Sequence, residues 1–113
     1  MDKLTRYKKL VKNIVSEIGQ TPGGAVHNLE MQTIIDDKNG QYLLYNNTWD
    51  GEKRLYGCFL HLEVRDNGKI WIHHDGTDLV VGEMLLENNV PKQDIVLGFR
   101  APIVRIDSGF AVA

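Results

Sequence analysis

The chain has 113 residues, of which 42% are hydrophobic and 25% are charged. This composition is typical of one globular domain spanning residues 1–113, and it excludes a disordered chain, a collagen-like repeat and a disulfide-rich scaffold. The net charge of −2 also excludes a polycation whose whole surface would coat nucleic acid.

Residues 3–18 have the pattern of an amphipathic helix, because apolar side chains recur at steps of three and four. Asp2 can cap the first amides, and Gly19 can adopt the left-handed conformation that ends a helix. The apolar side chains are Leu4, Tyr7, Leu10, Val11, Ile14, Val15 and Ile18.

The polar side of this helix is basic. Residues 1–12 contain five basic side chains against Asp2 alone, a local net charge of +4, and the rest of the chain sums to −6. Such a charge run is usually a solvated helix face, but it can also be an arm that faces a polyanion. Lys8, Lys9 and Lys12 are therefore candidate nucleic-acid-binding residues, and direct contact with DNA stays open.

After this helix the hydrophobic period changes to two, which predicts strands. Asn-Gly or Asp-Gly pairs separate neighbouring strands, and these pairs favour tight hairpins. Because parallel neighbours need about a dozen residues to cross over, the short connections predict an antiparallel meander. The expected strands are residues 28–36, 42–49, 55–65 and 69–74, and the turns contain Gly40, Gly51 and Gly68.

The hairpin around Gly68 can be assigned a register. A three-residue loop with Gly68 left-handed puts the apolar residues of both strands on one face, whereas a two-residue turn would mix polar and apolar side chains. The expected cross-strand pairs are Leu62 with Ile72, Val64 with Ile70, His61 with His73 and Glu63 with Trp71.

Residues 78–88 are expected to form a second helix, which Thr77 or Asp78 caps and Pro91 follows. A turn over 91–94 and a strand over 95–99 come next, and the apolar end at 110–113 is expected to dock on the domain. The fold class is therefore α+β: a single domain with an antiparallel meander of five or six strands, packed on two helices.

Cys58 is the only cysteine, so no intramolecular disulfide can form and a reducing compartment is favoured. No apolar signal segment or membrane span of about 18 residues is visible. We expect a cytoplasmic protein without membrane contact.

The candidate chemistry is sparse. His61, His73, His74 and Asp75 lie close in the sequence, but their spacing matches no zinc motif. No serine or cysteine has the setting of an activated nucleophile. We expect no catalytic residues, metal or cofactor, while a small metal-dependent or hydrolytic enzyme centred on His61, His73 and Asp75 is kept as an alternative.

A protein-binding face is the favoured interpretation of the polar side of the sheet. His61, Glu63, Trp71 and His73 share that side in the expected register, and Arg100 lies in a nearby loop. Tryptophan and arginine are enriched at binding hot spots. The alternative is that a second layer or a symmetric homodimer covers this face.

The chain resembles the XisI family, the fdxN element excision controlling factors of cyanobacteria. The resemblance spans the whole chain, and its most specific segment is Trp-Ile-His-His-Asp-Gly-Thr at residues 71–77. Residues 100–105 depart from the family, whose members carry a proline pair and then an aromatic-Lys-Arg run there. The other matching stretches are residues 1–4 with Tyr7, 57–58, 60–62, 69–70, 90–99 and 109–113.

The resemblance implies an accessory, non-enzymatic role. XisI-like proteins accompany XisH, which is similar to restriction-type nucleases, and both assist a separate site-specific recombinase during heterocyst differentiation. The resemblance therefore implies a XisH-like partner and only an indirect link to the recombinase. An antitoxin-like inhibitor of the XisH-like partner is the alternative use of the same surface.

Overall fold

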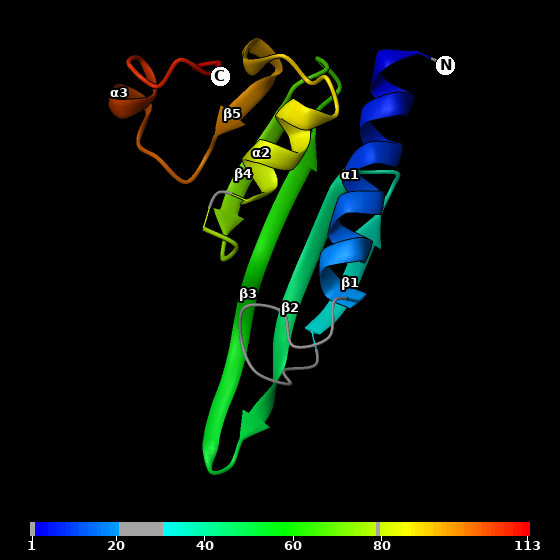
Figure 1. The fold of residues 1–113 in the computed structure, drawn as a ribbon, viewed down its shortest axis with the longest axis vertical. Coiled ribbons are helices and arrows are strands. Elements are labelled where there is room, and N and C mark those ends of the chain that lie inside the picture. The colour runs from blue at the N-terminus through cyan, green and yellow to red at the C-terminus, as the bar shows by residue number, and fades with distance from the viewer. Residues whose placement is uncertain (1, 21–30, 79) are drawn as a thin grey trace.

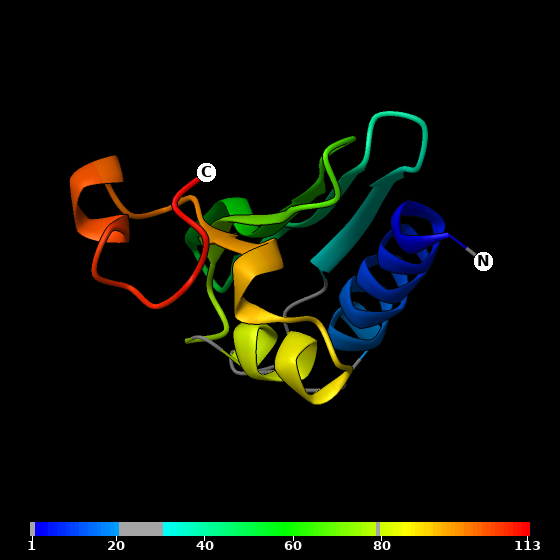
Figure 2. The ribbon, with the colours of Figure 1, turned by 90° about the horizontal axis from the view of Figure 1, so that it is seen from above.

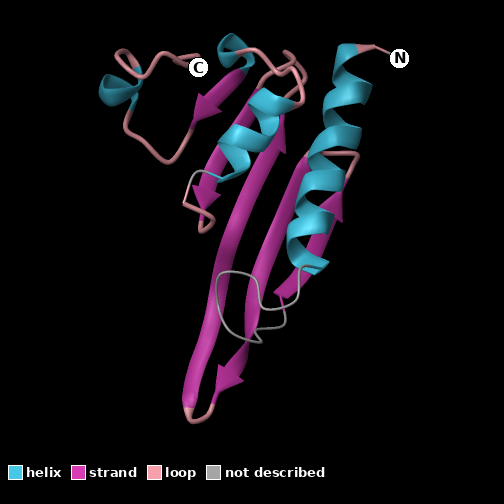
Figure 3. Cartoon of the chain, in the orientation of Figure 1, coloured by secondary structure: helices cyan, strands magenta, loops and turns pink. Residues whose placement is uncertain are grey.

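The computed structural model describes residues 2–20, 31–78 and 80–113, and it confirms the predicted α+β class (Figures 1 and 3). Residues 28–30 of the first expected strand lie outside this part. No helix among the described residues is long and apolar enough to cross a membrane. The elements are α1 (Lys3–Gln20), β1 (Met31–Asp36), β2 (Gln41–Asp50), β3 (Lys53–Val64), β4 (Ile70–Asp75), α2 (Val80–Glu87), the 3-10 turn η1 (Lys92–Asp94), β5 (Ile95–Leu97) and α3 (Pro102–Arg105).

The sheet has the strand order β1-β2-β3-β4-β5, and β1 to β4 form the expected antiparallel meander. The fifth strand corrects the expectation, because β5 pairs with β4 in parallel and the sheet is therefore mixed. α2 and η1 lie between these two strands in the chain. This connection is long enough to return the chain to the start of β4, which a tight hairpin cannot do.

α1 and α2 lie on the same side of the sheet, which we call the inner face (Figure 2). One core joins the buried side of α1 to strand residues such as Leu44. Gly19 does not end α1 as expected. A Cβ at Gly19 would lie 2.8 Å from both Leu44 Cδ2 and Thr33 Oγ1, so this glycine lets the last helical turn approach the sheet closely.

Of the two expected caps of α2, Thr77 contacts its first turn, and the helix covers Val80–Glu87 of the expected range 78–88. Thr77 Oγ1 accepts a hydrogen bond from the amide of Val81 at 3.3 Å. Asn89, with φ of 66°, turns the chain out of the helix, and the amide of Val90 donates to the carbonyl of Leu85.

The β3–β4 register agrees with the expectation except at one position. Gly68 is left-handed with φ of 82°, and Leu62 pairs with Ile72. A β-bulge then shifts the ladder, so that His61 pairs with His74 instead of His73. The extra residue in β4 sets two histidines against His61.

Candidate partner-binding site

The outer face of the sheet, opposite α1 and α2, brings four of the expected partner-binding residues together. Glu63 Oε1 lies 2.7 Å from His73 Nε2 and accepts a hydrogen bond from Arg65 Nε at 3.2 Å. The ring centroids of His61 and His73 are 4.7 Å apart, and those of His73 and Trp71 are 5.7 Å apart in a stacked arrangement. The expected grouping of these side chains is therefore present.

The protonation of this cluster follows from its contacts. Burial and the neighbouring His73 lower the pKa of His61, while Glu63 opposes that shift. Burial alone would raise the pKa of Glu63, but hydrogen bonds from His73 and Arg65 outweigh burial and hold it below its ordinary value. The cluster therefore favours a charged carboxylate beside a neutral His61 imidazole near neutral pH.

These shifts predict a loss of stability on acidification. The pKa of His61 is lower in the folded chain than its ordinary value of 6.5, so the unfolded chain binds the proton first. The free energy of unfolding should therefore decrease as pH falls from about 7 to about 5.5. Urea denaturation of the native chain and of His61→Gln measures this, and the decrease should be smaller in the variant. Equal pH profiles would contradict the assigned environment of His61.

Trp71 is a structural anchor on the outer face. It faces away from the main core as expected, and it is only 8% exposed. It forms a second small core with Val96 and Ala111. The guanidinium carbons of Arg65 and Arg105 lie 3.8 and 5.0 Å from the centroid of its ring. The protein's own chain therefore buries this indole, and no partner is needed to cover it.

Residues 98–113 form the cover, which we call the C-terminal hook. Arg105 Nε donates to the carbonyl of Arg100 at 3.0 Å, and the Arg105 guanidinium also reaches the carbonyls of Leu97, Gly98 and Val112. The expected docking of the chain end is confirmed at Ala111, whose amide donates to the carbonyl of Ile95 at 2.9 Å. Arg105 was not among the expected site residues, yet it holds the hook in shape.

The hook presents apolar side chains to solvent. α3 contains no buried residue, and Ile103 and Ile106 are 74% and 63% exposed. Arg100 is exposed beside Phe99, with its guanidinium carbon 5.6 Å from the ring centroid. The sequence signal for this patch is a run of aliphatic residues after Pro102. The large apolar side chains that the hook exposes are Phe99, Ile103, Val104, Ile106 and Val112.

The residues of the alternative enzymatic site, His61, His73 and Asp75, do not form a metal-binding group in the described part of the chain. Asp75 is the last residue of β4, and its carboxylate accepts hydrogen bonds from the amide and the hydroxyl of Thr77 in the turn that follows. Within residues 2–20, 31–78 and 80–113, no group of three His, Cys, Asp or Glu side chains is placed to hold a metal ion. His61 and His73 are adjacent, and Glu63 contacts His73 directly.

The expected nucleic-acid-binding residues form a separate surface. Lys8, Lys9 and Lys12 all lie on α1, which covers the inner face (Figure 2). The sheet therefore lies between these lysines and the outer face with its hook.

Comparison with known proteins identifies similar chains over nearly the full length. A family model described as XisI protein matches residues 1–112. The crystal structure of fdxN element excision controlling factor XisI from Anabaena variabilis ATCC 29413 is 34% identical, with a TM-score of 0.82, and the match covers 99% of this chain and 100% of that one. A XisI-like protein from the same organism is also 34% identical, with a TM-score of 0.83 and coverage of 97% and 99%. No protein of curated function matches significantly in sequence.

Proposed function

Because this chain belongs to the XisI family, we propose that it is a non-enzymatic factor that controls site-specific excision of a DNA element by binding a XisH-like protein. The name of the solved relative, an excision controlling factor, supports the controlling role. The contact to a XisH-like protein is the mechanism that we infer for it.

The exposed apolar hook is the observation that carries this proposal. Single exposed apolar side chains are common on soluble domains, but a contiguous group of them is typical of a protein–protein interface. Five such side chains lie within residues 99–112. Covering them with a partner removes apolar area from water, which is the main favourable contribution to association.

The outer-face cluster supplies the rest of the proposed interface. Trp71 and Arg105 hold the hook against the sheet, so the apolar patch is presented by a fixed scaffold. His61, Glu63 and His73 are half-buried beside it and provide polar groups for the rim. An apolar centre with a polar rim is the usual anatomy of a specific interface.

Co-expression with a XisH-like protein tests the proposal. A tagged XisH-like protein should retain the native chain through purification. The double variant Ile103→Asp/Ile106→Asp should weaken the complex by at least about tenfold in Kd, because two charges would be buried in the interface. Both side chains are largely exposed, so the variant should fold normally.

Trp49→Asp is the matched control for a change from apolar to charged. Trp49 is 60% exposed at the end of β2, away from the hook. This variant should bind the XisH-like protein as the native chain does. Binding that is lost with Trp49→Asp and kept with the hook variant would reject the hook as the interface. No retention of the native chain would reject the XisH-like partner.

A further inference from the structure

The part of α1 that does not pack on the core is cationic. The buried side of the helix is apolar, whereas Arg6, Lys9 and Lys12 are exposed and Lys8 is half-buried. We call these four residues the basic side of α1. In Figure 2, α1 is the outermost element on its side of the molecule.

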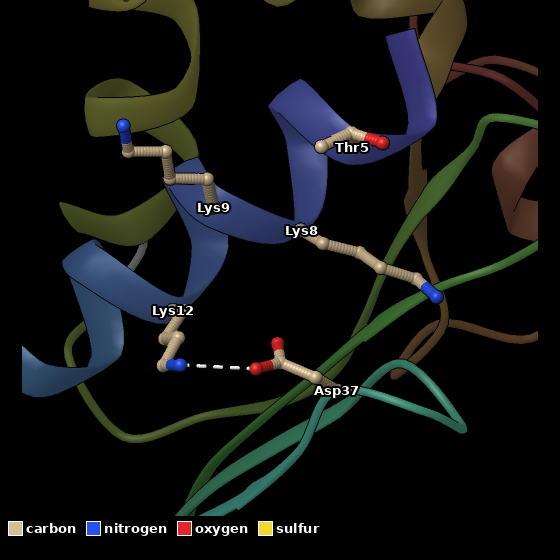
Figure 4. A pocket seen from close by; sticks show the side chains of 5 residues that line it. All are labelled: Thr5, Lys8, Lys9, Lys12 and Asp37. Carbon is tan, nitrogen blue, oxygen red and sulfur yellow. Dashed lines mark hydrogen bonds and ion pairs between the residues drawn. The ribbon is translucent and has the colours of Figure 1, made fainter. Parts of the chain in front are cut away.

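Two open hollows adjoin each other on this basic side. One, of about 290 Å³, is shown in Figure 4, and the other has a volume of about 240 Å³. Lys9 lines both, and both span the same turns of α1, so the hollows lie on either side of this lysine. The first is lined by Thr5, Lys8, Lys9, Lys12 and Asp37, and the second by Arg6, Lys9, Leu10, Asn13 and Asn88.

The lysine side chains around the first hollow point in different directions (Figure 4). Lys12 Nζ reaches Asp37 Oδ2 at 3.0 Å, while the ends of Lys8 and Lys9 diverge from it. One small anion could not contact all three ammonium groups. A chain of regularly spaced negative charges could contact them in succession.

We propose that the basic side of α1 binds the sugar–phosphate backbone of a nucleic acid. From Arg6 to Lys12 the helix rises about 9 Å. Each strand of a duplex presents a phosphate about every 3.4 Å of its axis, so about three phosphates can face these cations. Contacts of this kind position the protein without reading bases.

The charge distribution of the chain favours this orientation. Residues 1–12 sum to +4, and the remaining residues sum to −6. A polyanion is therefore attracted to the N-terminal part of α1 and repelled by much of the rest of the chain. The hook and its partner stay accessible, because α1 packs on β1, β2 and β3 while the hook extends beyond the β5 edge of the sheet (Figures 1 and 2).

Asp37 competes with the phosphate for Lys12. Its carboxylate also accepts a hydrogen bond from Tyr42 Oη at 2.8 Å, which keeps it beside the lysine. Lys12 and Asp37 are both about half exposed, and an ion pair of that exposure is weak, so a phosphate can displace the carboxylate. Asp37→Asn keeps an acceptor for Tyr42 and should therefore strengthen nucleic-acid binding severalfold.

Fluorescence anisotropy with a labelled duplex of about 20 base pairs tests the proposal, using the full chain without other proteins. Binding should be weak and independent of sequence. The slope of log K against log salt should be about −3, which corresponds to about three phosphate contacts. Lys8→Gln/Lys9→Gln should lower affinity at low salt at least tenfold and bring the slope to about −1.

Lys53→Gln/Lys92→Gln is the control, because it removes the same charge outside α1 and should leave affinity within about twofold. No binding of the duplex at low salt would overturn the proposal. An equal loss in the control would also overturn it, since total charge would then explain binding. Polyglutamate that competes as well as unlabelled duplex would assign the surface to an acidic protein instead. These outcomes do not depend on the hook or on a XisH-like protein.

Discussion

Replacing Trp71 by alanine is expected to lower the free energy of unfolding by about 3–5 kcal/mol. The indole fills the space between β4, β5 and the hook, where it contacts Val96 and Ala111. Its loss leaves a cavity and removes the ring beneath the Arg105 guanidinium. The hook should then become mobile, and binding of a XisH-like partner should weaken as a consequence. Urea denaturation and hydrogen exchange over residues 98–113 measure the two effects.

Trp71→Phe is the matched control for this change. It keeps an aromatic ring over which Arg65 and Arg105 can lie, and it removes only part of the volume. The indole N–H has no hydrogen-bond partner among the described groups, so its loss costs little. Trp71→Phe should therefore retain most of the stability and the protection of the hook. If both variants were equally stable, Trp71 would not hold the hook.

Gly40→Ala is the second change with a large expected effect. Gly40 has φ of 65°, and a Cβ there would lie 2.2 Å from the carbonyl oxygen of Val64. That contact involves the backbone of β3, and the amide of Val64 donates to the carbonyl of Gly40 at 2.8 Å. The alanine must therefore displace the β1–β2 turn from β3. We expect a loss of at least about 3 kcal/mol in the free energy of unfolding.

The variant Gly51→Ala separates the energetic cost of the left-handed backbone from the cost of the steric contact. Gly51 has nearly the same φ of 62°, but a Cβ there meets nothing within 4 Å. It should cost only about 1–2 kcal/mol, the penalty for a side chain in the left-handed region. The difference between the two variants in urea denaturation then measures the contact with Val64. A loss at Gly40 no larger than at Gly51 would show that the turn can move without cost.

The local secondary structure could be predicted from the sequence because the residues that specify it lie within a few positions of one another. In the β3–β4 hairpin, the alternating apolar residues determine which residues pair and which side of the sheet they face. Leu62 pairs with Ile72 and Val64 with Ile70 across the turn at Gly68. A slip of one residue would expose the apolar side chains. The grouping of Glu63 and His73 follows from the same register.

The bulge beside His61 and the end of α1 could not be predicted, because they depend on contacts between residues that are distant in the sequence. The bulge sets His74 opposite His61, and no local pattern signals an extra residue in β4. Gly19 would end many helices, but close packing against Leu44 and Thr33 keeps it inside α1. Tertiary contact outweighed local propensity in this turn.

For this protein, the sequence by itself determined α1, α2, the four-stranded meander and the side of the sheet on which His61, Glu63 and His73 lie. Only the tertiary structure decided that β5 runs parallel to β4, that the hook buries Trp71, and that Ile103 and Ile106 are left in solvent. The physical reason is the range of the interactions. Hairpins and helices are specified by neighbours in the chain, whereas burial under the hook depends on where a remote segment finds apolar area to cover.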